Sequence, residues 1–328
     1  MRIVGWVLYT LLCLVALAGG TLFGYARKSP LLITMIKTAL NPPKVGDAEI
    51  FDGNKDGVNL LVLGCDQDLY YKGEFVITKQ ARADMILVAR LDFKTNRITG
   101  VSIPRDTLCQ VPGYREQKIN SYHLLGQKNH GGPEGGKELM KRAVEFLLPV
   151  KIDRVLVLDY DAFQDMVDDV GGVSVNVAKQ MDYDDDAAKL HIHFKPGFYH
   201  MNGYQAMGYV RFRKSNKGHH GGDSDFARQD RQKQFLLAFK TALLKNMSAI
   251  AAVAEKAKAA ISNGLSDEEI IALAHFSRGI NQNNIKMGQV PVVDAGDYNL
   301  RIDTAELPKV LNEFHLVEDP ASRVSYRP

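Results

Sequence analysis

Short, strongly apolar segments recur through the middle of the chain, and they constrain its fold more than any other feature. Four of them are rich in Leu, Val and Ile and are bounded by glycine or charge: 59–64 (NLLVLG), 85–92 (MILVARLD), 98–104 (ITGVSIP) and 154–160 (RVLVLDY). That pattern is typical of strands buried on both faces. Residues 134–148 instead place apolar side chains at helical spacing. The alternation predicts an α/β fold, a three-layer α/β/α sandwich around a central mixed β-sheet.

The second half of the chain continues this alternation. A helix closed by Gly171 and Gly172 is predicted over 161–172, and a strand follows at 173–177. Further helices are predicted over 226–246, 249–261 and 304–314, and a late strand over 285–293. Ser266 and Glu269 have the spacing of a capping box that opens another helix. We expect one domain over 58–328.

The composition of the N-terminal segment is typical of a membrane anchor. Residues 3–25 carry no charge, and about 20 apolar residues suffice to cross a bilayer as a helix. A cleaved signal peptide is the alternative, but the run is longer than usual and no clean small-x-small site follows it. We therefore expect an anchor over 1–26 and a stalk over 27–57. Basic residues flank both ends, so charge does not settle the orientation.

Composition narrows the classes of function. A formal net charge of +3 over 328 residues is too small for a nucleic-acid-binding surface, which would show a dense basic stripe. Only Cys65 and Cys109 could pair in the predicted domain, so no disulfide framework is indicated. We expect both to be free thiols. Neither a GxSxG elbow nor a Walker loop is present, which leaves acyl hydrolysis and nucleotide-driven transfer without support.

Charged residues gather where the predicted buried strands end or begin. Asp66 follows the first strand, Arg82 and Asp84 introduce the second, and Arg105 and Asp106 follow Pro104, which must end a strand or lie at an edge. Further on, YVRFRK places Arg211 and Arg213 two apart, so that both side chains face the same way if the segment is extended. Asp225 then stands at a candidate N-cap, with Arg228 and Gln232 four apart on one helix face.

This set suits phosphate chemistry. Mg²⁺ takes one or two carboxylates plus phosphate oxygens, and arginine binds phosphate through its two-pronged guanidinium. For each residue a structural explanation is also open: Asp66 and Asp84 could cap turns, Arg105 and Asp106 could form a local ion pair, and YVRFRK could be an exposed edge strand. The residues alone do not decide between these readings.

Several ordered segments resemble the signature blocks of the LytR-CpsA-Psr family of cell-wall ligases. They are NLLVLGCD, RADMILV, SIPRDT, KIN at 118–120, and HMNGYQAMGYVRFRK followed by DFARQDRQ. The resemblance spans about residues 58–240. It implies a membrane-anchored, extracytoplasmic bacterial phosphotransferase that moves a glycopolymer from a polyprenyl pyrophosphate carrier onto peptidoglycan. The glycopolymer, whether teichoic acid, capsule or another wall polymer, is not specified. The segment between Asp66 and Arg82 is longer than the family pattern implies.

Carried over by position, the resemblance implies roles for the charged residues. Asp66 and Asp84 become Mg²⁺ ligands, and the pyrophosphate contacts become Arg82, Arg105, Arg211 and Arg213, with Arg228 and Gln232 completing the rim. Asp106 is expected to orient Arg105, and Asp225 is our candidate for the general base. Two alternatives remain: hydrolysis of the polyprenyl pyrophosphate, or a non-catalytic membrane-bound sensor or attenuator that binds lipid-linked intermediates.

A polyprenyl tail also requires an apolar slot leading away from the phosphate rim. We hypothesise that it lies between the sheet and the helices at 134–148 and 161–169. The candidate lining residues are Phe146, Leu156, Leu158, Phe163 and Val167. The alternative is that these five side chains fill the core, which requires the same residue types.

Two histidines on a predicted strand are not interpreted as a metal site. His191 and His193 lie on one face of a predicted strand, which is compatible with metal binding, but no third ligand stands at a diagnostic spacing. Solvated strand positions are the simpler interpretation. The neighbouring acidic patch, 182–186, lacks an EF-hand pattern and is expected to be surface.

Overall fold

The computed structural model describes residues 56–316 with gaps. Outside the description lie 66–67, 72–73, 78–80, 130–131, 187–189, 213–214, 217–221, 223–224 and most positions between 247 and 278. The side chains of 68–71, 74–77, 159, 225, 226 and 229 are likewise outside it. Among the residues the structure describes, no helix is both long and apolar enough to cross a membrane. The predicted anchor and stalk fall almost entirely outside this part of the chain.

A five-stranded mixed sheet forms the centre of the molecule, in the order β13-β5-β4-β1-β8. β1 (Gly57–Cys65) pairs antiparallel with β4 (Ala83–Asp92) and parallel with β8 (Arg154–Asp159). β5 (Arg97–Ser102) pairs antiparallel with β4 and parallel with β13 (Ile285–Gln289). The four apolar runs therefore form strands as predicted, and the mixed sheet is confirmed.

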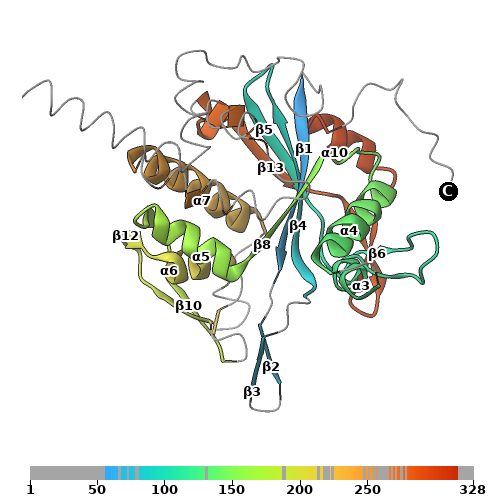
Figure 1. Ribbon diagram of the computed structural model, residues 1–328, viewed down its shortest axis with the longest axis horizontal. Coiled ribbons are helices and arrows are strands. Elements are labelled where there is room, and N and C mark those ends of the chain that lie inside the picture. The colour runs from blue at the N-terminus through green and yellow to red at the C-terminus, as the bar shows by residue number, and fades with distance from the viewer. Residues whose placement is uncertain are drawn as a thin grey trace, which may run out of the picture.

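Helices cover both faces of this sheet (Figure 1). On one face lie α3 (Ser121–Asn129), α4 (Pro133–Leu147) and α10 (Leu307–Glu313). Their apolar side chains join Leu61, Leu63 and Val88 in the largest core cluster. On the other face, Leu237 of α7 (Asp225–Lys245) packs with Phe276 and other residues of the last third of the chain. These layers form the predicted sandwich.

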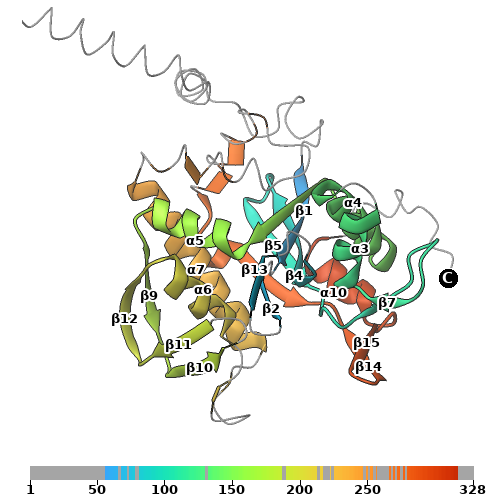
Figure 2. The same ribbon diagram turned by 60° about the horizontal axis from the view of Figure 1, so that its bottom comes forward.

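A second core lies to the side of the sheet, formed by helices and two antiparallel strand pairs (Figure 2). It contains α5 (Tyr160–Asp169), α6 (Gly203–Arg211), β9 (Val173–Val177), β10 (Met181–Asp185), β11 (Leu190–Phe194) and β12 (Gly197–Met201). β9 pairs with β12, and β10 pairs with β11, both antiparallel. α7 packs across this unit and joins it to the sheet.

The remaining elements are short. They are β2 (Asp68–Tyr71), β3 (Glu74–Ile77), β6 (Leu108–Cys109), β7 (Gln117–Lys118), the 3-10 helix η1 (Gln282–Asn284), β14 (Val292–Gly296) and β15 (Asn299–Ile302). β2 and β3 form a hairpin between β1 and β4, within the segment between Asp66 and Arg82. The predicted late strand is divided at Pro291 into β13 and β14, because proline has no amide hydrogen for the ladder.

Two local predictions are confirmed in detail. Gly171 and Gly172 follow α5 with φ of 84° and 90°, a left-handed conformation that closes helices and favours glycine. Ser266 and Glu269 make both bonds of a capping box, at 2.9 and 3.1 Å. Cys65 and Cys109 are both buried, and they are not joined by a disulfide.

Candidate functional site

The strand directions bring the charged residues predicted at the strand ends to one edge of the sheet, the edge at which the strands end rather than an outermost strand. β1, β5, β8 and β13 all end at this edge, and the antiparallel β4 begins there. Cys65 is the register partner of both Ala83 and Asp159, so Asp84 and the start of α5 lie on either side of the end of β1. Two strand spacings separate them, about 10 Å.

Arg105 is held at this edge by two carboxylates. Its Nη1 lies 3.0 Å from Asp84 Oδ1, and its Nε lies 3.8 Å from Asp106 Oδ2. Asp106 makes a shorter contact with Lys118, whose Nζ lies 2.7 Å from Asp106 Oδ1. The expectation that Asp106 orients Arg105 is therefore only partly met, because Asp84 is the closer partner. About half of the Arg105 side chain remains exposed, so the guanidinium is available to an anionic ligand.

The backbone fixes the turn that carries Arg105. β5 ends before Pro104, and Thr107 N donates to Pro104 O at 3.1 Å to close the turn. Leu300 N donates to Asp106 O at 3.1 Å, which attaches the turn to β15. Lys118 was not assigned a role from the sequence. Its KIN block was visible, but its pairing with Asp106 depends on the docking of β7 against the turn.

Arg211 is presented by a helix, and the extended conformation considered for YVRFRK is wrong for residues 209–211. Asn202 and Gln205 form a capping box that starts α6, and the helix continues to Arg211. The guanidinium carbon of Arg211 lies 4.1 Å from the ring centroid of Tyr160, the first residue of α5. This cation–π contact places Arg211 beside the end of β8. Arg213 lies outside the described residues, so the expectation that it binds pyrophosphate together with Arg211 stays a prediction.

α7 holds the last turn of α6 in place. Arg231, which is buried, donates through Nε to Tyr209 O at 2.6 Å and through Nη2 to Phe212 O. Gln232 Nε2 donates to Val210 O at 3.4 Å. These donors satisfy carbonyls at the helix C-terminus that lack intrahelical partners, and burial lowers the pKa of Arg231 to about 10. Within this network Gln232 supports the helix that carries Arg211.

The other predicted residues are placed with less detail. Arg228 is half-buried on α7, and Asp225 begins that helix, but the Asp225 side chain is outside the description. Arg82 is exposed immediately before β4, two residues before Asp84. Asp66, the other predicted metal ligand, lies outside the described residues.

A buried histidine supports the start of β4 and was missed from the sequence. His123 Nδ1 lies 2.7 Å from Ala81 O and 3.6 Å from Cys65 Sγ. Burial lowers the pKa of His123, which favours the neutral imidazole. Gln127 Oε1 accepts from Ala81 N at 3.0 Å. Together these contacts fix the backbone that precedes Arg82 and Asp84.

The five residues predicted to line a lipid slot do not share one lining. Val167 is 1% exposed in the second core, where Phe163 packs beside it. Leu156 belongs to a cluster on the sheet face opposite α4, and Leu158, two residues along the same strand, points to that face as well. Phe146 on α4 is 40% exposed. The predicted location of the slot, between α4, α5 and the sheet, is therefore wrong, because the two helices bury their apolar faces in different cores.

A comparison with protein-family models covers both the described fold and the ordered sequence blocks. The model of the LytR_cpsA_psr family matches residues 34–315. The chain belongs to the LytR-CpsA-Psr family. Its membership agrees with the resemblance carried by the blocks around Asp84, Arg105 and Arg211.

Relatives within the LytR-CpsA-Psr family bear two kinds of name. The chain is 32% identical over 243 residues to the polyisoprenyl-teichoic acid–peptidoglycan teichoic acid transferase TagV of Bacillus subtilis, covering 72% of this chain and 57% of TagV. It is 27% identical over 260 residues to the regulatory protein MsrR of Staphylococcus aureus, covering 77% of this chain and 71% of MsrR. The chain thus spans little more than half the length of TagV.

Solved structures of the family share the fold. The crystal structure of B. subtilis TagV superposes with a TM-score of 0.59 at 30% identity, covering 81% of this chain and 99% of that one. The structure of TagT bound to LIIa-WTA superposes with a TM-score of 0.56 at 25% identity, covering 80% and 90% of the two chains.

Proposed function

We propose that this protein is a phosphotransferase that attaches a polyprenyl-pyrophosphate-linked glycopolymer to peptidoglycan. The observation that carries the proposal is the placement of Arg105. It is half-exposed, is held by Asp84 at 3.0 Å, and lies at the edge where the buried strands end. The family membership and the similarity to TagV, a named teichoic acid transferase, support the same activity.

The reaction joins a sugar hydroxyl of peptidoglycan to the phosphorus at the end of the polymer. The hydroxyl oxygen forms the new P–O bond, the bond to the carrier phosphate breaks, and polyprenyl phosphate leaves with the bonding electrons. Arg105 and Arg211 neutralise charge on the phosphate oxygens and on the leaving group, with Arg82, Arg213 and Arg228 as further candidates. Asp225 is our candidate to accept the proton of the attacking hydroxyl.

Asp84 fits a role in holding Mg²⁺ with the substrate. Its carboxylate is 37% exposed and meets Arg105 through Oδ1, so an ion held there would share the edge with the phosphate-binding guanidinium. Mg²⁺ usually keeps one or two carboxylates and completes its shell with water and phosphate oxygens. Asp66 is the second candidate ligand. When bound, the ion would offset the negative charge of the pyrophosphate during transfer.

We also propose a location for this activity. The uncharged segment at 3–25 anchors the chain in the cell membrane as a single span, and residues 27–57 form a stalk. The domain then stands on the extracytoplasmic side, where both the lipid-linked polymer and peptidoglycan are accessible. Alkaline phosphatase fused to the C-terminus should be active in this arrangement, and an inactive fusion at normal expression would contradict it.

Reconstitution tests the activity directly. The full chain in detergent is mixed with a polyprenyl-pyrophosphate-linked oligosaccharide, Mg²⁺ and soluble peptidoglycan fragments, and the products are identified by mass spectrometry. Polymer phosphate joined to the peptidoglycan sugar is the expected product. Free polymer phosphate in its place would identify a hydrolase, and bound but unaltered lipid would identify a sensor or attenuator. The similarity to the regulatory protein MsrR favours the sensor as the second candidate.

A further inference from the structure

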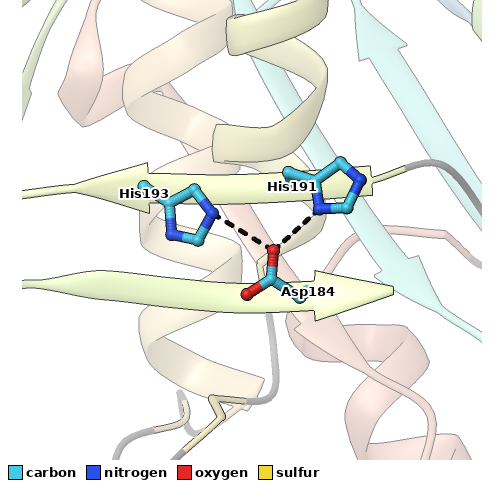
Figure 3. A group of neighbouring side chains, drawn as sticks. All are labelled: Asp184, His191 and His193. Carbon is cyan, nitrogen blue, oxygen red and sulfur yellow. Dashed lines mark hydrogen bonds and ion pairs between the residues drawn. The ribbon is translucent and has the colours of Figure 1, made fainter. Parts of the chain in front are cut away.

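The hairpin of β10 and β11 brings two exposed histidines and an exposed aspartate together. In the antiparallel register Asp184 lies opposite His191, and Asp182 lies opposite His193. His191 Nδ1 is 2.7 Å from Asp184 Oδ1, and His193 Nε2 is 3.1 Å from the same oxygen (Figure 3). One carboxylate oxygen thus faces two imidazole nitrogens. The third ligand that the sequence spacing did not show is supplied across the strand pair.

We propose that Asp184, His191 and His193 bind a divalent transition metal ion of the zinc type. One atom from each residue lies within 4.8 Å of the other two. In a tetrahedral zinc site, bonds of about 2.0–2.2 Å to nitrogen and oxygen place neighbouring ligand atoms about 3.3 Å apart. The three side chains are exposed, so small rotations open the present contacts to that spacing. Two imidazoles favour zinc, copper, nickel or iron over Mg²⁺, which prefers oxygen ligands.

Neighbouring residues restrict the orientation of these three side chains. Asp182 Oδ1 lies 2.7 Å from His193 Nδ1, so the other ring nitrogen, Nε2, is turned toward Asp184. A carboxylate on the distal nitrogen of a ligating histidine is the usual outer partner in zinc proteins. Asn216 fixes Asp184 from the other side, donating from Nδ2 to Oδ2 at 2.7 Å and accepting from the Asp184 backbone N at 3.0 Å.

The site also bridges two parts of the second core. Asn216 N donates to Asp182 O at 2.9 Å, and His191 N donates to the hydroxyl of Tyr204 on α6 at 3.0 Å. A bound ion would therefore fasten the hairpin to α6 and to the segment that follows it. Three protein ligands leave a fourth position for water or for a ligand atom, as in zinc sites that are not purely structural.

Metal titration of the full chain tests the proposal. The protein is purified without a histidine tag, stripped with a chelator and titrated with Co²⁺, then with Zn²⁺. We expect one equivalent of Co²⁺ with the visible spectrum of a four-coordinate nitrogen and oxygen site, displaced by Zn²⁺. His191→Ala and His193→Ala should abolish it, and Asp184→Asn should weaken it. Asp182→Ala should lower the affinity about 10- to 100-fold, as for other outer partners.

Matched controls separate this site from adventitious binding. His200→Ala removes another exposed histidine, from β12, whose contacts are with Ser174 and Gly171, and should leave Co²⁺ binding unchanged. Circular dichroism checks that each variant is folded. The proposal is overturned if the wild-type chain takes up neither ion at micromolar concentration, or if the double variant of His191 and His193 binds as the wild type does. Loss of binding only on changing His219 and His220 would also overturn it.

Discussion

Replacing Arg105 with lysine separates the two explanations for the charges that follow Pro104. In one, Arg105 and its carboxylates form an ion pair that closes a turn. In the other, the guanidinium is positioned by Asp84 to receive phosphate. Lysine preserves the charge but loses the planar fork that binds an oxyanion bidentately. The two explanations therefore predict different ratios of lost stability to lost activity.

The exposure of the ion pair sets the expected loss of stability, and the loss of activity should be much larger. The Arg105–Asp84 distance is 3.0 Å, but the two side chains are 50% and 37% exposed, and exposed pairs contribute about 0.2–1 kcal/mol. The stability cost should thus stay below about 1 kcal/mol, or about 2–4 °C in melting temperature for a domain of this size. Removing a charge-stabilising donor from a transition state costs about 10²- to 10³-fold in rate, so we expect kcat/KM to fall at least about 100-fold.

The assay is the reconstituted transfer reaction, with thermal unfolding measured on the same samples. Arg97→Lys is the matched control, since Arg97 is exposed and begins β5 at the opposite edge of the sheet. It should change neither quantity. Wild-type turnover in Arg105→Lys, or a fall in melting temperature of more than about 10 °C that accounts for the lost turnover, would refute the phosphate-binding role.

Four further outcomes follow from the same structure. Asp84→Asn should raise the Mg²⁺ concentration needed for half-maximal transfer, because an amide is a poorer ligand for a hard cation; an unchanged Mg²⁺ titration would show that Asp84 only orients Arg105. Tyr160→Leu removes the ring 4.1 Å from Arg211, and kcat/KM should fall about 2- to 30-fold for a contact of about 0.5–2 kcal/mol; undiminished kcat/KM would exclude the contact as a positioning device. Val167→Trp should destabilise the protein by about 1–3 kcal/mol by overpacking a site that is 1% exposed; denaturant unfolding at wild-type midpoint would argue for space there. Burial raises the pKa of Cys109 to about 12, with Glu116 adding to the shift, so alkylation at pH 8 should spare Cys109 until the protein unfolds, and peptide mapping that finds it modified would contradict this burial.

The strands of the central sheet could be predicted because their sequences are locally decisive. Short runs rich in Leu, Val and Ile, bounded by glycine or charge, favour buried strands because they are shorter than most helices and are enriched in β-branched residues. Their order could not be predicted. β13 begins at Ile285 and pairs with β5, which begins at Arg97, a pairing set by packing of distant segments that leaves no mark in either run. The mixed class of the sheet could be predicted from the sequence. The placement of β8 and β13 as its outermost strands could not.

The site was predictable to the same extent. Charged residues were expected at the strand ends, and Asp84 and Arg105 lie there in contact at 3.0 Å, while their roles in binding metal and phosphate stay predictions. Lys118 and Tyr160 were missed because each acquires its role from a contact across elements. Asp184 was missed as a partner of His191 for a similar reason, since cross-strand register cannot be read from spacing along one strand.

The misplacement of Arg211 has a more specific cause. The two-residue spacing of Arg211 and Arg213 suggested an extended segment, and glycine, which stands at 203 and 208, has a low helix propensity. Yet a Cβ at Gly203 would lie 2.3 Å from Gln164 O, and Gly203 N donates to Asp168 Oδ1 at 2.8 Å. Glycine is required there because α6 approaches the backbone of α5 closely, not because the chain bends. That close approach joins α6 to the helix that begins with Tyr160, and so determines where Arg211 is presented.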